Sequence, residues 1–365
     1  MSLTDSQRDL RCPGRRCHRR APLLPIRRDQ CPRCCRGVHI DAWRRDRCLN
    51  IVFRSAQGHL AAMTSNDPHR HHYVPQFYLT QFACHDDENK VTTLAAYNGR
   101  DIVAERKSIS RIGYEEKLHD YEFKGEKRSI EGTINDQIET PFTQGSTWRK
   151  VTSGRTAELD ESDIEPLYGL IHHLQRRNLE TLRFIEMEQE RIRRHGFSAD
   201  DSEEERAMYM ALAAHPDAVR DFFHEGILQE APYLDDAAEL GMLVYRTGLR
   251  FRTSTNPVIA IGLPGEEAAR KRANGDAARA WWLPLTPHCG VVMTLGASFT
   301  GYSNAEIPDD SAQGLNRHYL VQLLEALSVR YILAEDRHIE SDLEWAGYRI
   351  EMRTNQGFRY RKPPG

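Results

Sequence analysis

A long amphipathic pattern between Ser162 and His195 sets the first limit on how this chain can fold. Charged residues fill the positions between apolar residues that recur every three or four positions, at Ile164, Leu167, Ile171, Leu174, Leu182 and Ile185. This spacing places the apolar side chains on one face of an α-helix. Ser162 with Glu165 has the spacing of a capping box, and Gly196 follows three basic residues. The pattern predicts one long helix from Ser162 to His195.

The segments around this helix indicate the fold class. Residues 91–97 have strand-like content and end at an Asn-Gly turn, after which 101–104 can return as a hairpin partner. Further helices are expected at 130–150, interrupted near Pro141, and at 202–228, 235–245 and 311–329. Strands are expected at 249–253, 257–262, 281–285, 290–295, 330–334 and 348–352. We therefore expect an α+β fold with a helical middle and a mainly antiparallel sheet in the C-terminal third.

Residues 1–62 differ in composition from the rest of the chain. They hold 14 Arg and 5 Asp, neither Lys nor Glu, and six of the eight cysteines. Subtraction from the totals of 50 Lys and Arg and 53 Asp and Glu leaves 36 basic and 48 acidic residues, so residues 63–365 carry a net charge of −12. We interpret 1–62 as a non-native or disordered Arg/Cys-rich extension preceding a start at Met63, and 63–365 as a single domain.

An alternative interpretation of the same extension is a zinc knuckle. Cys31 and Cys34 are separated by two residues, and Cys12 and Cys17 could complete a tetrahedral thiolate site beside arginines suited to nucleic acid. The gap between Cys12 and Cys17 is wide for a typical knuckle, and hydrophobic periodicity is absent. A zinc assay on the full-length chain would separate the two interpretations.

Localisation follows from apolar segments that the sequence lacks. No run approaches the roughly 18 apolar residues that a membrane span requires. Residues 21–26 are too short and too proline-rich for a secretory signal. We expect a cytoplasmic protein with reduced thiols and no membrane partner.

The segment from His71 to Leu79, His-His-Tyr-Val-Pro-Gln-Phe-Tyr-Leu, followed by Phe82, resembles the opening signature of the bacterial family known as domain of unknown function 4238. Further matches follow in order, at Ile112-Gly-Tyr114, Ile130-Glu-Gly132, Arg176, 253–259, 283–287 and Leu315-Asn316. The resemblance covers roughly residues 70–336 and excludes the first 62. It implies no reaction, cofactor or substrate.

Two positions depart from the family pattern. Thr255 stands where the family usually has Asp before the Asn-Pro pair, and Thr80 stands where it usually has Arg. An activity that requires the carboxylate is therefore in doubt for this chain.

The opening segment also carries the densest cluster of titratable side chains. His71 and His72 can share acid/base work, and Gln76 must pair its amide if it lies among apolar residues. His69 would share a strand face with His71, but the sequence offers no fixed third ligand, so we assign no metal site. Structural hydrogen bonds are the alternative role for these histidines.

Other candidates lie near this segment or in the C-terminal third. Asn256 precedes Pro257, which holds it extended and fixes its amide direction, and Ser254 adds a hydroxyl. Tyr73 and Tyr78 could stack on a planar ligand, with core packing as the alternative. Arg176 or Arg177 could pair with a phosphate, with a solvated helix face as the alternative. We assign His71, His72, Gln76 and Asn256 as catalytic, and Arg176, Tyr73, Tyr78 and Ser254 as substrate-binding.

The sequence lacks the motifs of the commonest enzyme classes, including the P-loop, the nucleophile elbow, the zinc helix and the dinucleotide fingerprint. The leading hypothesis is a hydrolase-like protein acting on a phosphate-containing substrate, such as RNA or DNA in a toxin or defence setting. The competing hypothesis is a non-catalytic module that binds a protein partner, in which the opening segment is structural. The charge of −12 disfavours nucleic acid. The sequence assigns no cofactor.

Overall fold

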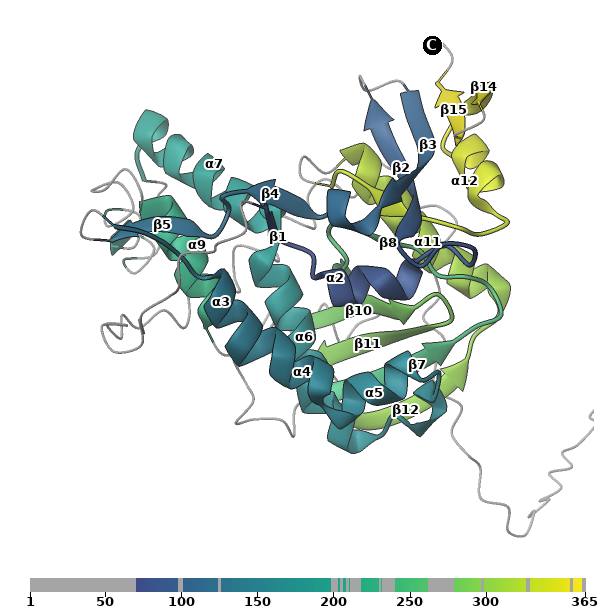
Figure 1. The fold of residues 1–365 in the computed structure, drawn as a ribbon, viewed down its shortest axis with the longest axis horizontal. Helices are drawn as coiled ribbons and strands as arrows, with labels where there is room; N and C mark the ends of the chain where they lie inside the picture. The colour runs from purple at the N-terminus through teal and green to yellow at the C-terminus, as the bar shows by residue number, and fades with distance from the viewer. Residues whose placement is uncertain are drawn as a thin grey trace, which may run out of the picture.

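The computed structural model describes residues 70–97, 101–123, 126–197, 203, 206–207, 210, 218–229, 231, 240–261, 279–296, 299–325, 329–354 and 357–362. Within these ranges, no helix is both long enough and apolar enough to cross a membrane. Figure 1 shows α7, α9 and β5 at one end of the molecule and β14, β15 and α12 at the other. The expected α+β class is confirmed by this mixture of helices and mostly antiparallel strands.

A five-stranded sheet forms the centre of the fold. Its order is β12 (Gly301–Glu306), β7 (Leu240–Arg246), β11 (Cys289–Leu295), β10 (Arg279–Thr286) and β9 (Ile259–Ile261). β12 pairs with β7 in parallel, and the other neighbours are antiparallel. Alternate residues of β10 enter different apolar clusters, with Trp281 and Leu283 on one side and Trp282 on the other. The sheet is therefore buried on both faces.

A six-stranded sheet joins segments from both ends of the described chain. Its order is β14 (Arg349–Thr354), β15 (Gly357–Arg361), β3 (Asp101–Ser108), β2 (Lys90–Tyr97), β13 (Ile332–Leu333) and β8 (Thr253–Ser254). Its neighbouring strands are antiparallel. The β2–β3 hairpin was predicted and is confirmed, while its turn at 98–100 lies outside the described residues. Two more helices, α11 (Asp309–Glu325) and α12 (Ile339–Trp345), belong to this C-terminal part.

The middle of the chain is helical, as predicted. It contains α3 (Glu131–Ile134), a π-helix η4 (Asn135–Glu139), α4 (Thr140–Gln144), α5 (Ser146–Thr152), α6 (Ile164–Arg177), α7 (Leu179–His195) and α9 (Ala218–Leu228). Before it, β1 (Arg70–His72) pairs with β4 (Tyr114–Glu116), and β5 (Asp120–Phe123) pairs with β6 (Glu126–Ser129). The short helix α2 (Gln76–Leu79) follows β1.

The predicted single helix from Ser162 to His195 is wrong in one respect. Asn178 is extended, with φ −79° and ψ 156°, and separates α6 from α7. Its side chain accepts a hydrogen bond from the backbone N–H of Thr181 and so caps α7. The periodic pattern continues across the break because both helices turn apolar faces inward. The observed capping box is also shifted, since it uses Asp160 and Asp163, whereas Gly196 ends α7 as predicted.

Other predictions need correction. The predicted helix at 235–245 is contradicted from Leu240 onward, where the chain forms β7. β7 lies between β12 and β11 and is covered on both faces, so its apolar run has no period of two that would reveal a strand. Of the expected strand at 249–253, Thr253 alone belongs to a strand. The helical segment at 130–150 is interrupted by the π-helix and by Gly145, while Pro141 opens α4.

The proposed extension at 1–62, with its alternative zinc knuckle, lies outside the described residues, as does His69. Its interpretation stays a prediction. Most of the opening segment, in contrast, is part of the core, since Tyr73, Val74, Tyr78 and Leu79 are buried in the larger apolar cluster.

Candidate functional site

A group of buried polar side chains gathers where β1 and the start of β5 meet helices α3 and α6. We call it the histidine cluster, and it consists of His71, His119, Glu131, His173 and Arg177. His71 and His119 are 0% exposed, and Arg177 is 1% exposed. Burial of polar and charged groups is costly unless they are paired. The pairing within the cluster therefore shows what each group can do.

His71 comes from β1 and is held by the chain beside His119. Its Nδ1 accepts a hydrogen bond from the His119 backbone N–H at 2.8 Å. A neutral imidazole with Nδ1 as acceptor carries its proton on Nε2. That Nε2 lies 3.5 Å from Asp120 Oδ1, and the rings of His71 and His119 stack with centroids 5.2 Å apart. His71 is thus a fixed hydrogen-bond donor through Nε2.

His119 has the opposite arrangement of ring nitrogens. Its Nδ1 pairs with Glu131 Oε2, and its buried Nε2 has no hydrogen-bond partner among the described residues. Burial, and then the nearby Arg177 guanidinium, holds the pKa of His119 well below its usual range. With its proton on Nδ1 facing the carboxylate, neutral His119 presents a lone pair at Nε2. This is the arrangement of a general base oriented by a carboxylate.

Arg177, the last residue of α6, ties the carboxylates together. Its guanidinium lies 3.5 Å from Glu131 Oε1 and also pairs with Glu139. Glu139 ends the π-helix η4, and π-helical turns in proteins are frequent at functional sites. Arg177 Nη1 also lies 3.3 Å from His173 Nε2. Two carboxylates therefore share one buried guanidinium.

The exposed edge of the cluster is formed by His72 and Gln76. Gln76 is exposed, and its Nε2 lies 3.1 Å from His72 Nε2. Burial lowers the pKa of half-buried His72, and so do the positive charges of Arg177 and Arg70. His71, His72 and Gln76, which were predicted together, thus lie together beside Arg177.

The other predicted substrate-binding residues near this segment have different surroundings. Arg176 Nε donates to His172 Nε2 at 3.3 Å, while the neighbouring Arg177 faces the cluster. The hydroxyl of Tyr78 contacts Thr253 Oγ1 at 2.7 Å and donates to the Pro284 carbonyl at 2.8 Å. Burial raises the pKa of Tyr78, and it raises the pKa of Tyr73 to about 12. These contacts fit the packing alternative for both tyrosines.

Asn256 and Ser254 belong to a separate buried network at β8. Ser254 Oγ contacts the Asn256 carbonyl at 2.7 Å and Gln322 Oε1 at 2.9 Å. The Asn256 side chain reaches the helical part of the fold, where its Oδ1 accepts from Asn178 Nδ2 at 3.0 Å. Asn256 is thus one residue removed along the chain from Arg177, rather than in contact with the histidines.

The two departures from the family pattern have local explanations. Thr255 Oγ1 accepts from the backbone N–H groups of Arg330 at 2.9 Å and Tyr331 at 3.2 Å. An aspartate could accept the same bonds, so the threonine keeps the structural role of that position. Thr80 is exposed and donates to the Phe77 carbonyl at 2.8 Å.

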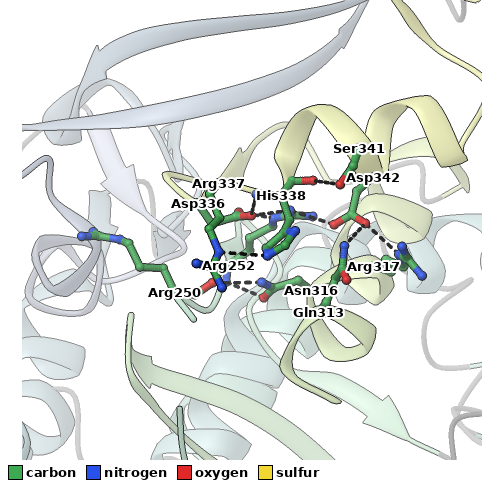
Figure 2. A network of polar contacts seen from close by, with 10 residues as sticks. All are labelled: Arg250, Arg252, Gln313, Asn316, Arg317, Asp336, Arg337, His338, Ser341 and Asp342. Atoms are coloured by element: carbon green, nitrogen blue, oxygen red, sulfur yellow. Dashed lines mark hydrogen bonds and ion pairs between the residues drawn. The ribbon is translucent and has the colours of Figure 1, made fainter. Parts of the chain in front are cut away.

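A second buried polar network joins the C-terminal elements. Figure 2 shows Arg252 between Asp336 and Asp342, with Gln313 and Arg317 on the far side of Asp342. Arg252 Nη2 lies 2.8 Å from Asp336 Oδ1 and 2.8 Å from Asp342 Oδ2. Its charges pair with one another, and its members come from the segment before β8, from α11 and from α12. We interpret this network as structural.

Sequence analysis missed the chemistry of His119 and Glu131. His119 belongs to no motif, and its role depends on strand pairing that brings it beside His71. Glu131 lies within the matched segment Ile130-Glu-Gly132 and was therefore available as a signal. In the described part of the chain, no group of three or more His, Cys, Asp or Glu side chains could hold a metal ion.

Comparison with known proteins gives one match. A family model described as "Protein of unknown function (DUF4238)" matches residues 70–338. No curated protein and no solved structure matches the chain significantly. The matched region contains the entire histidine cluster and ends between Asp336 and Asp342 of the second network.

Proposed function

The chain belongs to the family described as "Protein of unknown function (DUF4238)", and we propose that its histidine cluster is the acid–base site of a hydrolase-like enzyme acting on a phosphate-containing substrate. The family description names no reaction, so the proposal rests on the site. One observation carries it: His119 is bonded through Nδ1 to Glu131 and offers a buried Nε2 without a partner among the described residues.

His119 is the proposed general base. Its Nε2 takes a proton from water as the water oxygen forms a bond to phosphorus and the ester P–O bond breaks. The imidazolium that results faces the Glu131 carboxylate, and its proton passes to the leaving oxygen. Glu131 stabilises that cation and is itself held by Arg177. His71 supplies a fixed N–H donor beside the base.

The charges at the exposed edge support an anionic substrate. Arg177 and Arg70 both lower the pKa of His72, so their positive field acts at the half-buried ring. Gln76 adds an exposed amide next to it. A substrate with few charges fits better than a long nucleic acid, because residues 63–365 carry a net charge of −12 from 36 basic and 48 acidic residues.

A hydrolysis screen with matched variants tests the proposal. Wild type, His119→Ala and Glu131→Gln would be assayed on a phosphomonoester, a phosphodiester, RNA and DNA, with and without divalent cations. Loss of the base should lower the rate by about 10²- to 10⁴-fold. His85→Ala is the control, since His85 is exposed. Full activity of His119→Ala in a folded protein would refute the assignment.

The competing function is a non-catalytic module that binds a protein partner. The observation favouring it is the burial of Tyr73, Val74, Tyr78 and Leu79, which makes most of the opening segment a packing element. The charged helix α7 also exposes Met187 at 57%. Absence of hydrolysis of every substrate by the wild type, together with a partner lost on Met187→Glu, would favour this function.

A further inference from the structure

We infer that Asn256 is a positioning residue that fixes the break between α6 and α7, and thereby holds Arg177 against the histidine cluster. Asn256 was predicted as catalytic from its place before Pro257. The contacts indicate that it acts through Asn178 instead. The effect on a reaction rate rests on the proposed function, whereas the effect on Arg177 and His119 does not.

The main chain at Asn256 is anchored in the C-terminal part of the fold. Its N–H donates to Ser254 Oγ at 3.0 Å, and its carbonyl accepts from Gln322 Nε2 at 3.1 Å. The next carbonyl, of Pro257, accepts from the Tyr319 hydroxyl at 2.6 Å. Gln322 and Tyr319 both come from α11. Asn256 is therefore a fixed point on which another element can be placed.

The Asn256 side chain connects this point to the helix break. Its Oδ1 accepts from Asn178 Nδ2 at 3.0 Å, and its Nδ2 donates to Glu180 in the first turn of α7. Asn178 in turn accepts from the Thr181 N–H at 3.0 Å through Oδ1. Asn178 and Asn256 are each 5% exposed. Because an unmade bond at a buried amide is costly, this pair fixes where α6 ends.

Arg177 directly precedes this fixed residue. Its guanidinium joins α6 to Glu131 and Glu139 and contacts His173. A shift of the α6 end would move the guanidinium relative to Glu131, which bonds His119. Asn256 thus determines the position of a cation that acts on the histidine, although its own contacts are with Asn178 and Glu180.

The test is the titration of His119 in the full chain, followed by NMR with ¹⁵N-labelled histidine and assigned by the signal lost in His119→Gln. Arg177 lowers the pKa of His119. In Asn256→Ala, where Arg177 is less well fixed, the titration midpoint should move to higher pH. Asn178→Ser provides a second variant, because serine still caps α7 but cannot reach Asn256. It should move the midpoint in the same direction.

The control is Asn304→Ala, which removes a half-buried amide bonded to Arg246 and Tyr302 on the five-stranded sheet. It should leave the His119 titration unchanged. A wild-type midpoint in both folded variants, Asn256→Ala and Asn178→Ser, would overturn the inference. If the wild type hydrolyses no substrate but the midpoints shift, the positioning role stands while the proposed function fails.

Discussion

Histidines buried in the neutral form make the stability of this protein depend on pH. His224, on α9, donates through Nε2 to the Leu118 carbonyl at 2.9 Å and lies edge-on to His119. Burial lowers the pKa of His224 from 6.5 to about 4. The unfolded chain binds the proton more readily between these values, so the free energy of unfolding falls as the pH falls through that window. His119 and His173 act in the same direction.

We therefore predict that stability is fully present above pH 6.5 and declines toward about pH 4. His224 accounts for roughly 3 kcal/mol of this decline when it is fully developed. His224→Gln, which can still donate to Leu118, should flatten the dependence, and His85→Gln at an exposed position should not. Urea unfolding at a series of pH values measures both. Identical slopes for wild type and His224→Gln would contradict the prediction.

The adjacent residues Arg176 and Arg177 should respond differently to the same substitution. Arg177→Met leaves the carboxylates of Glu131 and Glu139 without their buried guanidinium, and loss of one partner from a buried ion pair costs about 3–5 kcal/mol. Arg176→Met removes a half-buried side chain that contacts His172, and its cost should be clearly smaller. Equal midpoints in urea for the two variants would show that Arg177 is not a central ion-pair partner.

At the scale of elements, local patterns predicted regular structure well and failed where distant contacts decide. The β2–β3 hairpin and α11 were predicted near their observed positions, because alternation and helical spacing are local signals. The break at Asn178 was not predicted, since it depends on a bond to Asn256. His71, His72 and Gln76 were found because they are neighbours in sequence, whereas the link to His119 requires the fold.

Two glycines provide a test at this scale with opposite signs. Gly169 lies in α6, and no atom in the described structure lies within 4 Å of where its Cβ would be placed. Gly169→Ala should stabilise the protein by about 0.5–1 kcal/mol, because alanine favours helix more than glycine does. At Gly290 in β11, an added Cβ would lie 2.2 Å from the buried Trp282 ring. Gly290→Ala should destabilise by at least about 1–3 kcal/mol. Thermal unfolding of both variants measures the signs, and a stabilised Gly290→Ala would contradict this packing.

At the scale of the whole molecule, the fold extends past the end of the family match at residue 338. β15 pairs with β3 from the other end of the described chain, and Leu343, Tyr348 and Tyr360 are buried in the second apolar cluster. Figure 2 shows Asp342 of α12 reaching Arg252. A mainly antiparallel C-terminal sheet was expected, but its closure by N-terminal strands was not, because strand pairing across such a separation leaves no local signal.

Asp342 should therefore be essential for joining the C-terminal segment to the rest. Its carboxylate is 0% exposed and pairs with Arg252 at 2.8 Å and Arg317 at 2.7 Å. Asp342→Ala leaves the buried Arg252 with a weaker complement of charge and should cost about 3–5 kcal/mol. Asp309→Ala is the matched control, since its pair with Arg337 is largely exposed and is worth about 1 kcal/mol or less. Hydrogen exchange adds the location of the effect: in Asp342→Ala, the amides of β14 and β15 should lose protection together with those of α12. Loss confined to α12, with β15 still protected against β3, would instead mean that the sheet alone holds the C-terminal segment in place.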